Sequence, residues 1–580
     1  MARFEVWAPR ADRMRVRIDE TDHELSAGEA GWWSAEVSSA EAGTDYAFLI
    51  GDDETPIPDP RSLWQPAGVH EPSRVYDQSE YVWSDQDWTG KPLPGGVIYE
   101  LHIGTFTPEG TFGAAAGRLD HLVELGIDFV EVLPVNAVNG THNWGYDGVG
   151  WYAVHEPYGG PDGFKRFVDA CHHRGIGVIL DVVYNHLGPS GNYLDRFGPY
   201  LTDAGASTWG KFVNLDQPGS DTVRRHIVDN ALMWLRDYHV DGLRLDAVHA
   251  FSDHRAIHLL EQLATEVDEL AAHVRRPLSL IAESDLNDPR LISSREAGGY
   301  GLAAQWSDDF HHALHTLLTG ERQGYYADFG SLPGLAKVLR KAFFHDGTWS
   351  SFRGRSHGRP VDVLRTGGWK FVVCLQNHDQ IGNRATGDRI GATLSTGRLK
   401  IGAALLLTGP FTPMLFMGEE WAASTPWQFF TSHPEPELAA TVAAGRRAEF
   451  ADHGWTGEVP DPQDPQTFLR SKLDWDEVED EPHAGVLDFY RRLIALRHER
   501  PELTHPALAA VEVQYDEDRD WLVLERGPLS VVVNLAAERQ MVPLSGNAVE
   551  LLLASAQGFL YTGNQLELDG ESVAIVRIAG

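Results

Sequence analysis

The residues best suited to catalysis are polar side chains that stand where apolar, strand-like runs end. The run GVILDVVYN carries Asp181 and is followed by His186, and the run VDGLRLDAV carries Arg244 and Asp246. Three more apolar runs end in acids, namely Glu283, Asp308 with Asp309, and Asp379 with its neighbours Asn377 and His378. One carboxylate after a strand is commonly a helix N-cap. Repeated acids beside histidine or arginine are better explained by one shared site.

Carboxylates that converge near an arginine and two histidines suit cleavage of a glycosidic bond. One carboxylate must stay ionised to attack the anomeric carbon, and another must carry a proton for the leaving oxygen. Arg244 lies two positions before Asp246, so both side chains face one side of a strand and the guanidinium would hold Asp246 ionised. Glu283 follows two apolar residues, a setting that raises the pKa of a carboxyl group. We therefore predict Asp246 as nucleophile, Glu283 as general acid/base, and Asp379 as a ligand of the sugar hydroxyls.

The elements that must position these side chains are eight apolar runs that alternate with amphipathic helical patterns after Gly96. The runs span 97–106, 128–135, 177–185, 240–248, 278–285, 302–310, 371–379 and 411–420. Near-continuous apolar strands alternating with helices predict a parallel sheet covered on both faces, and eight such strands close a barrel. A doubly wound open sheet is the alternative, but no GxGxxG fingerprint follows the first strand. We expect an α/β chain with a (β/α)8 TIM barrel, whose strand ends surround one cavity.

Short strand-like runs separated by turns flank this barrel at both ends of the chain. They predict an N-terminal immunoglobulin-like β-sandwich over residues 1–90 and a C-terminal β-sandwich over residues 505–580. The catalytic barrel would then occupy residues 91–504, with insertions near 185–220, 321–368 and 425–480. The second insertion is expected to be helical and to end in a basic, glycine-rich loop.

The composition narrows the class of partner. The chain has 580 residues and a formal net charge of −36, which opposes nucleic acid and anionic membrane surfaces but not a neutral sugar. The 18 tryptophans suit sugar stacking as well as core packing. Cys171 and Cys374 show no metal-ligand spacing, and the first residues contain no apolar signal core, so a cytoplasmic protein is expected.

Four separate stretches resemble the α-amylase superfamily of glycoside hydrolases. They are DVVYNH (181–186), GLRLDAVH (242–249), AES (282–284) and QNHDQIGN (376–383), in the order that this superfamily uses. The resemblance implies the same roles for Asp246 and Glu283 and makes Asp379 the transition-state stabiliser. It further implies that the sugar at the cleavage point is surrounded by Tyr146, His186, Arg244, His378, Gln380 and Asn383.

Further segments resemble the members of this superfamily that release trehalose. These segments are 308–330, 418–433, 445–450 and 460–475; branching enzymes share only the start of the first. The implied reaction is hydrolysis of the α-1,4 bond beside the terminal α,α-trehalose of maltooligosyltrehalose, which releases trehalose and a shorter maltodextrin. The expected ligands of the leaving trehalose are His249, Asp308, Asp309, His311 and His312. At least one of His311 and His312 is expected to pack within a helix instead.

Other expectations concern what is bound and what is not. Trp427, Phe429, Phe430, Tyr325 and Tyr326 are candidates for the cleft wall, with core packing as the alternative. The stretch after the third barrel strand is short and holds few acids, so no structural calcium, no other metal and no cofactor are expected. Two alternative functions stay open: a branching or debranching enzyme of the same superfamily, and a non-catalytic glucan-binding protein.

Overall fold

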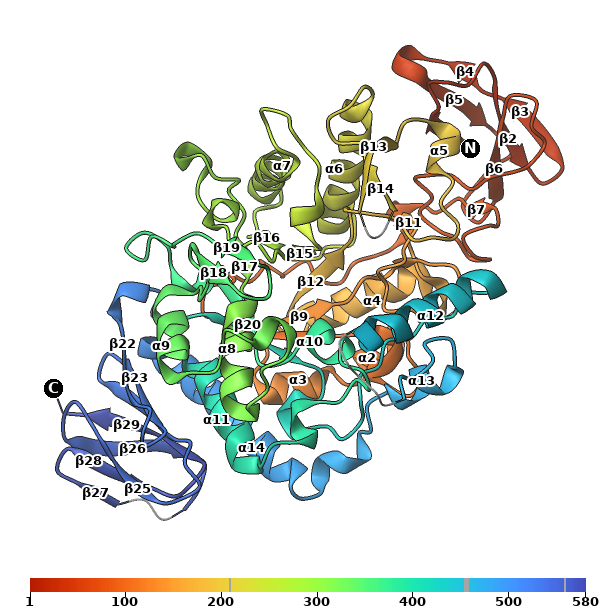
Figure 1. Cartoon of the computed structure of the whole chain (residues 1–580). Helices are drawn as coiled ribbons and strands as arrows, with labels where there is room; N and C mark the ends of the chain where they lie inside the picture. Colours follow the sequence, from red (N-terminus) through yellow and green to blue (C-terminus); the bar gives the residue numbers. More distant parts are fainter. Residues whose placement is uncertain (208–209, 453–457, 558–559, 580) are drawn as a thin grey trace.

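The centre of the molecule is a closed barrel of parallel strands (Figure 1). The computed structural model describes residues 1–207, 210–452, 458–557 and 560–579. Each barrel strand pairs with the next along the chain, and the last, β21, returns to the first, β8. The strands are β8 (Ile98–Leu101), β9 (Phe129–Val132), β12 (Gly177–Val182), β15 (Gly242–Leu245), β16 (Ser279–Ala282), β17 (Ala304–Trp306), β20 (Phe371–Cys374) and β21 (Thr412–Phe416). The expected (β/α)8 barrel is confirmed.

Alternation along the strands explains why the barrel has an apolar floor beneath a charged layer. Successive residues of a strand point to opposite faces, so every second side chain enters the barrel. The floor is one buried cluster, formed by Ile98, Phe129, Ile179, Ile281, Ala304, Trp306, Val372, Cys374 and Met414. Two positions further along the strands stand Glu100, Glu131, Asp181 and Glu283. The charged layer therefore lies toward the carboxyl ends of the strands.

Helices cover the outside of the barrel in the stretches between its strands. They are α2 (Phe112–Ala116), α3 (Leu119–Leu125), α4 (Gly160–His172), α6 (Ser220–Asp237), α7 (Leu259–Val274), α8 (Asp308–Thr319), α11 (Thr396–Thr408) and α14 (His483–Glu499). Short elements complete the barrel region: α1 (Ile103–Phe106), β10 (Asn136–Ala137), β11 (Gly150–Val154) and α15 (Pro501–Thr504). Across the described ranges, no helix has the length and apolar character needed to cross a bilayer.

All eight barrel strands end before the predicted runs that contain them, and two of these differences bear on the site. The run 302–310 forms β17 only to Trp306, and α8 begins at Asp308. The run 371–379 forms β20 only to Cys374, and α10 (His378–Gly382) begins four residues later. The side chain of Asn377 accepts a hydrogen bond from the Gln380 amide at 2.8 Å, which caps α10 and fixes its start. Asp308 and Asp379 therefore stand in first helical turns rather than on strands.

Sheets at the two ends of the chain flank the barrel on opposite sides (Figure 1). The N-terminal sheets run β1-β5-β4 and β3-β2-β6-β7, from β1 (Ala2–Trp7), β2 (Met14–Ile18), β3 (Thr21–Glu24), β4 (Ser26–Ala27), β5 (Trp32–Val37), β6 (Asp45–Ile50) and β7 (Ser73–Arg74). The C-terminal sheets run β22-β23-β24-β29-β26 and β25-β28-β27. Their strands are β22 (Val511–Asp516), β23 (Trp521–Arg526), β24 (Leu529–Asn534), β25 (Gln540–Pro543), β26 (Ala548–Ala554), β27 (Leu560–Thr562), β28 (Gln565–Leu568) and β29 (Ser572–Ile578).

The three insertions each contribute regular structure near the barrel. The first holds α5 (Leu194–Phe197) and the hairpin of β13 (Leu201–Ser207) and β14 (Gly210–Val213). The second holds α9 (Leu332–Lys341), but its expected basic loop is a hairpin of β18 (Thr348–Ser350) and β19 (Arg355–His357). The third holds α12 (Pro436–Asp452) and α13 (Pro465–Arg470). Parts of the ranges 185–220, 425–480 and 505–580 lie outside the described residues.

Candidate active site

Arg244, at the carboxyl end of β15, joins acids from three neighbouring strands. Its Nη1 donates to Asp181 at 2.9 Å and to Oδ1 of Asp246 at 2.7 Å, while its Nη2 lies 3.8 Å from Oε2 of Glu283. The guanidinium carbon lies 4.3 Å from the ring centroid of Trp306, in cation–π contact. Arg244 is fully buried, so its planar donors are held in place. The structure thus brings together the predicted nucleophile and the predicted general acid around one guanidinium.

The Asp246 carboxylate is oriented from both of its oxygens. Nδ2 of Asn185 donates to Oδ2 at 2.7 Å, and Arg244 donates to Oδ1. The same amide also donates to the Asp246 backbone carbonyl at 3.0 Å. The next residue, Ala247, has φ +42° and ψ 50°, a left-handed conformation that a non-glycine residue adopts only where its surroundings hold it. This arrangement holds the carboxyl group in a fixed orientation, as a nucleophile requires.

The Glu283 carboxyl group lies in a setting that favours its protonated form. Burial raises its pKa to about 8; Arg244 opposes this shift, and the negative charges of Asp246, Asp308 and Asp379 add to it. Its Oε2 accepts a hydrogen bond from the Ala247 amide at 2.6 Å, which links it to the turn after Asp246. A protonated carboxyl group beside a second one that a guanidinium fixes in place suits the division of roles that glycosidic cleavage needs.

Asp379 is held between a histidine and an amide. Nε2 of His378 lies 3.4 Å from Oδ2 of Asp379, and Nδ2 of Asn383 donates to Oδ1 at 3.0 Å. Nδ1 of His378 lies 2.6 Å from Oε1 of Glu100, and the His378 amide donates to Oε2 at 2.9 Å. Burial alone would lower the pKa of His378, but Asp379 and Glu100 outweigh it and raise the pKa to about 9. His378 is thus a cation that orients Asp379.

Tyr146 and His186 form the wall beside these acids. The Tyr146 ring stacks on His378 with centroids 5.1 Å apart, and its hydroxyl donates to Asp181 at 2.6 Å. Nε2 of His186 lies 2.9 Å from the Tyr146 carbonyl, and Nδ1 lies 2.6 Å from Oδ1 of Asn185. Tyr146 and His186 therefore stand beside Arg244 and Asp246, where the motif resemblance implies that they surround the sugar.

The predicted leaving-side residues separate into inner and outer groups. Oδ2 of Asp309 accepts hydrogen bonds from Asn287 at 2.8 Å and from the amides of Phe344 at 2.7 Å and His345 at 3.0 Å. His311 is 1% exposed, and its two ring nitrogens lie 2.7 Å from the Leu375 carbonyl and 2.9 Å from the Tyr326 hydroxyl. We therefore assign Asp309 and His311 a supporting role, since their polar atoms are occupied within the protein. This departs from the expectation that they bind substrate, and it agrees with the helix-packing alternative for one histidine.

The outer group consists of His249, Asp308, His312 and Gln380, which keep more exposure. His249 follows Asp246 in the chain, and its Nε2 lies 3.9 Å from Oδ1 of Asp285. His312 lies beside Tyr325, with ring centroids 4.9 Å apart, and burial raises the pKa of Asp308. Gln380 follows Asp379 in the first turn of α10. These four stay candidates for contact with the leaving sugar.

Sequence reasoning missed the hairpin of β18 and β19 as part of this site. Nη1 of Arg353, in its turn, lies 3.1 Å from Oδ2 of Asp285, two residues after Glu283. Phe352 beside it is 51% exposed, so one aromatic face remains available next to this arginine, and Trp349 on β18 is 63% exposed. The signal present in the sequence was the pairing of aromatic residues with arginine in a glycine-rich segment.

Three of the candidate aromatic wall residues are core instead. Trp427 and Phe430 have no exposed surface, and Tyr326 is 6% exposed. Nε1 of Trp427 donates to the His378 carbonyl at 3.0 Å, so this residue positions the catalytic wall from behind. Phe429 and Tyr325 are partly exposed and stay candidates.

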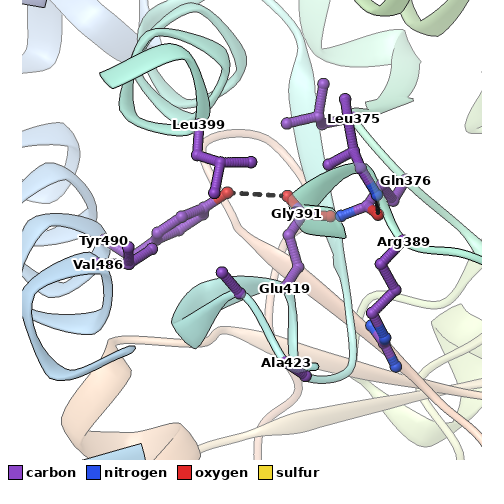
Figure 2. Close-up of a pocket in the computed structure, with 11 residues that line it drawn as sticks. Leu375, Gln376, Arg389, Gly391, Leu399, Glu419, Ala423, Val486 and Tyr490 are labelled. Atoms are coloured by element: carbon purple, nitrogen blue, oxygen red, sulfur yellow. Dashed lines mark hydrogen bonds between the residues drawn. The ribbon is translucent and has the colours of Figure 1, made fainter. Parts of the chain in front are cut away.

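A small pocket lies between the residues after β20 and β21 and helix α14 (Figure 2). Figure 2 shows the Tyr490 hydroxyl donating to Glu419, at 3.1 Å, near Arg389. The cavity volume of this pocket is about 10 Å³, which holds one water molecule at most. Burial raises the pKa of Glu419 to about 8, so its carboxyl group is neutral near pH 7 and serves the packing of α14.

The described residues contain no group of three or more histidine, cysteine or acidic side chains arranged to hold a metal ion. Asp195 and Asp203, the acids after the third barrel strand, both lie near Nζ of Lys211, at 3.3 and 2.9 Å. Cys171 and Cys374 are buried free thiols. A lysine ammonium between the two aspartates supplies the positive charge there.

Comparison with known proteins agrees with the geometry. The protein-family model described as "Alpha amylase, catalytic domain" matches residues 79–203. A second family model, "Domain of unknown function (DUF3459)", matches residues 506–575. A crystal structure of a putative alpha amylase from Salmonella typhimurium superposes with a TM-score of 0.91 at 38% identity, covering 100% of this chain and 97% of that one. Fold and site together define a glycosidase of the α-amylase type.

Closer relatives narrow this class. The malto-oligosyltrehalose trehalohydrolase of Rhizobium sp. (strain M-11) is 57% identical over 99% of this chain and 97% of its own length. The malto-oligosyltrehalose trehalohydrolase of Arthrobacter ramosus is 59% identical over 99% of both chains. The chain belongs to the malto-oligosyltrehalose trehalohydrolase family.

Proposed function

We propose that this protein hydrolyses the α-1,4-glucosidic bond next to the terminal α,α-trehalose of maltooligosyltrehalose, releasing trehalose and a maltooligosaccharide. The observation that carries the proposal is similarity over the whole length, at 57% and 59% identity, to relatives with that name. Asp246 and Glu283, which the buried Arg244 joins, are the pair of carboxyl groups that such a reaction needs.

The proposed reaction has two steps with retention at the anomeric carbon. In the first, an Asp246 oxygen attacks the anomeric carbon while Glu283 gives its proton to the departing oxygen of trehalose. This breaks the glycosidic bond and leaves a covalent glycosyl ester on Asp246. In the second, Glu283 takes a proton from water, the water oxygen attacks the anomeric carbon, and Asp246 leaves as a carboxylate. Asp379 would hold the sugar hydroxyls in both steps.

The supporting residues act by orientation and charge. Arg244 keeps Asp246 anionic and lies near enough to stabilise its departure. Tyr146 would pack against the sugar ring at the cleavage point, because its ring is fixed by stacking on His378. His249, Asp308, His312 and Gln380 would contact the leaving trehalose.

A comparison of two substrates of equal length tests the proposal. Maltotriosyltrehalose and maltopentaose both contain five glucose units and differ only in the linkage at one end. We expect rapid release of trehalose and maltotriose from the first and slow attack on the second. Equal cleavage of both would indicate a general amylase. New branch points formed on longer glucans would indicate a branching enzyme, the second candidate.

A cytoplasmic location stays a prediction from the sequence. Activity fractionation of the producing cells would test it, with trehalose release expected in the cytoplasmic fraction.

A further inference from the structure

Helix α12 (Pro436–Asp452), in the third insertion, extends an arginine to the helix that carries Asp379. In Figure 1 α12 lies beside α10, and Nη2 of Arg446 donates to the Gly382 carbonyl at the end of α10. The Arg446 side chain is 9% exposed and lies over two aromatic rings, 5.1 Å from the centroid of Phe429 and 4.6 Å from that of Phe450. Arg446 is thus held in a fixed position beside the site.

A single amide connects this arginine to Asp379. Nη1 of Arg446 donates to Oδ1 of Asn383 at 3.4 Å, and Nδ2 of Asn383 donates to Oδ1 of Asp379 at 3.0 Å. Nη1 also lies 3.2 Å from Oε2 of Glu449, which balances its charge at the surface. The Arg446 guanidinium, the Asn383 amide and the Asp379 carboxylate therefore form one chain of hydrogen bonds.

The chemistry of a guanidinium group fixes the direction of this chain of hydrogen bonds. A guanidinium has donors and no acceptor, so only the oxygen of the Asn383 amide can face Arg446. The amide nitrogen must then face Asp379, which is an acceptor when ionised. Without Arg446, the Asn383 amide oxygen loses this donor, and the amide has more freedom to rotate away from Asp379.

We propose that Arg446 is a positioning residue for the proposed hydrolysis: through Asn383, it fixes the Asp379 carboxylate in the orientation that binds the sugar at the cleavage point. This inference rests on the proposed role of Asp379 in the reaction. It assigns the third insertion a function, since α12 then completes the catalytic wall from the side opposite His378.

The test compares Arg446→Met with Arg447→Met on the same helix. Methionine keeps the packing between the two phenylalanine rings and removes every donor. Arg447 is the matched control, because its side chain is 54% exposed and lies 3.9 Å from Asp461. We expect Arg446→Met to lower kcat roughly 10- to 100-fold, the cost of one hydrogen bond to a charged group, with little change in KM. Arg447→Met should match the wild type.

A double-mutant cycle separates positioning from packing. If Arg446 acts through Asn383, then adding Arg446→Met to Asn383→Ala should change kcat less than about twofold, because the path is already broken. Multiplicative losses in the double variant would overturn the inference. So would wild-type kcat in Arg446→Met, or equal losses in Arg446→Met and Arg447→Met. Should Arg446→Met fail to fold, Arg446→Lys is used in its place, with a partial loss of kcat expected because lysine keeps charge but lacks the fork.

The pH profile provides a readout that a packing defect would leave unchanged. The charge of Asp379 helps to raise the pKa of Glu283, so a displaced Asp379 moves the basic limb of kcat/KM to lower pH. We expect this shift in Arg446→Met and not in Arg447→Met. All rates are compared with wild type on the α-glucan that wild type cleaves. A wild type that releases no trehalose therefore contradicts the proposed function alone, whereas an unaffected Arg446→Met contradicts only this inference.

Discussion

At the scale of single residues, the site separates two carboxyl groups by their environments. Asp246 receives hydrogen bonds from Arg244 and Asn185, while Glu283 is buried next to other acids. The same guanidinium contacts both groups, at 2.7 Å and 3.8 Å, so its shorter contact favours the anion at Asp246. The different roles of Asp246 and Glu283, nucleophile and general acid, are therefore favoured by the different contacts of their carboxyl groups.

A substrate with a good leaving group should distinguish the two roles. Fluoride leaves without protonation, so Glu283→Gln should still form the glycosyl-enzyme from α-maltotriosyl fluoride, although it loses about 10²- to 10⁴-fold of its rate on maltotriosyltrehalose. Asp246→Asn should lose roughly 10⁴-fold or more on both substrates, because the amide is no nucleophile. Rates are followed by fluoride electrode and by product chromatography. An active Asp246→Asn would remove that residue from the role.

The raised pKa of Glu283 predicts the basic limb of the pH profile. The group must hold a proton to act as acid, and its pKa is about 8, so kcat/KM should fall about tenfold per pH unit above that value. The fall comes with rising pH because deprotonation removes the acid. With the fluoride substrate, formation of the glycosyl-enzyme by Glu283→Gln should show no such limb. A limb that persists in that variant would assign it to another group.

At the scale of elements, the segment before β8 that contains Asp85 and Trp88 contacts the barrel through a buried histidine. His172, the last residue of α4, lies 2.8 Å from Oδ2 of Asp85 and 3.0 Å from Oδ2 of Asp241. Trp88 stacks on its ring at 4.5 Å and donates to Oδ1 of Asp241 at 2.8 Å. Burial lowers the pKa of His172, but the two carboxylates outweigh it, so the net pKa is raised.

Replacing this histidine should destabilise the fold in a pH-dependent way. A pKa raised on folding stabilises the native state below the unfolded value of about 6.5, and this stabilisation is lost as pH rises through the folded pKa. His172→Gln should therefore lower Tm most below that pH, at a cost of roughly 3 kcal/mol, with the gap to wild type narrowing at higher pH. The control is His173→Gln, whose side chain is 54% exposed. Thermal melts that show a constant gap at every pH would contradict this account.

Periodicity predicted the barrel strands and helices because both depend on local apolar spacing. All eight predicted runs contain a barrel strand. The run that includes His378 was predicted too long because the side chain of Asn377 caps a helix that begins inside it. The run that includes Asp308 likewise contains the start of a helix, α8. Motif resemblance brought the acids together, but it could not show that Asp309 faces backbone amides.

Contacts between distant segments were beyond the reach of sequence spacing. Glu100 lies in the first barrel strand, β8, and binds His378, which follows the seventh barrel strand, β20. No local sequence pattern marks that pair. The approach of Arg446 to Asn383 is of the same kind. Such pairs depend on how the strands are arranged around the barrel, and the sequence pattern gives their order but not their facing side chains.

At the scale of the whole molecule, the flanking sheets brace the helices around the barrel. Arg61, between β6 and β7 of the N-terminal sheets, lies 2.9 Å from Asp229 on α6. Glu571, in the C-terminal part, lies 2.8 Å from Arg398 on α11 and accepts from Ser395 at 2.6 Å. The formal charge of −36 lies on a molecule whose proposed substrate is uncharged, so it favours solubility without opposing binding.

The most direct measurement is proton NMR of fresh maltotriosyltrehalose as the enzyme cleaves it. Both central claims, the position of the bond and retention at the anomeric carbon, are read from one spectrum. We predict that trehalose and the α anomer of maltotriose appear first, and that the β anomer grows in later as the sugar mutarotates. Early β-maltotriose would contradict a covalent intermediate on Asp246. Release of glucose or maltose in place of trehalose would contradict the proposed position of cleavage.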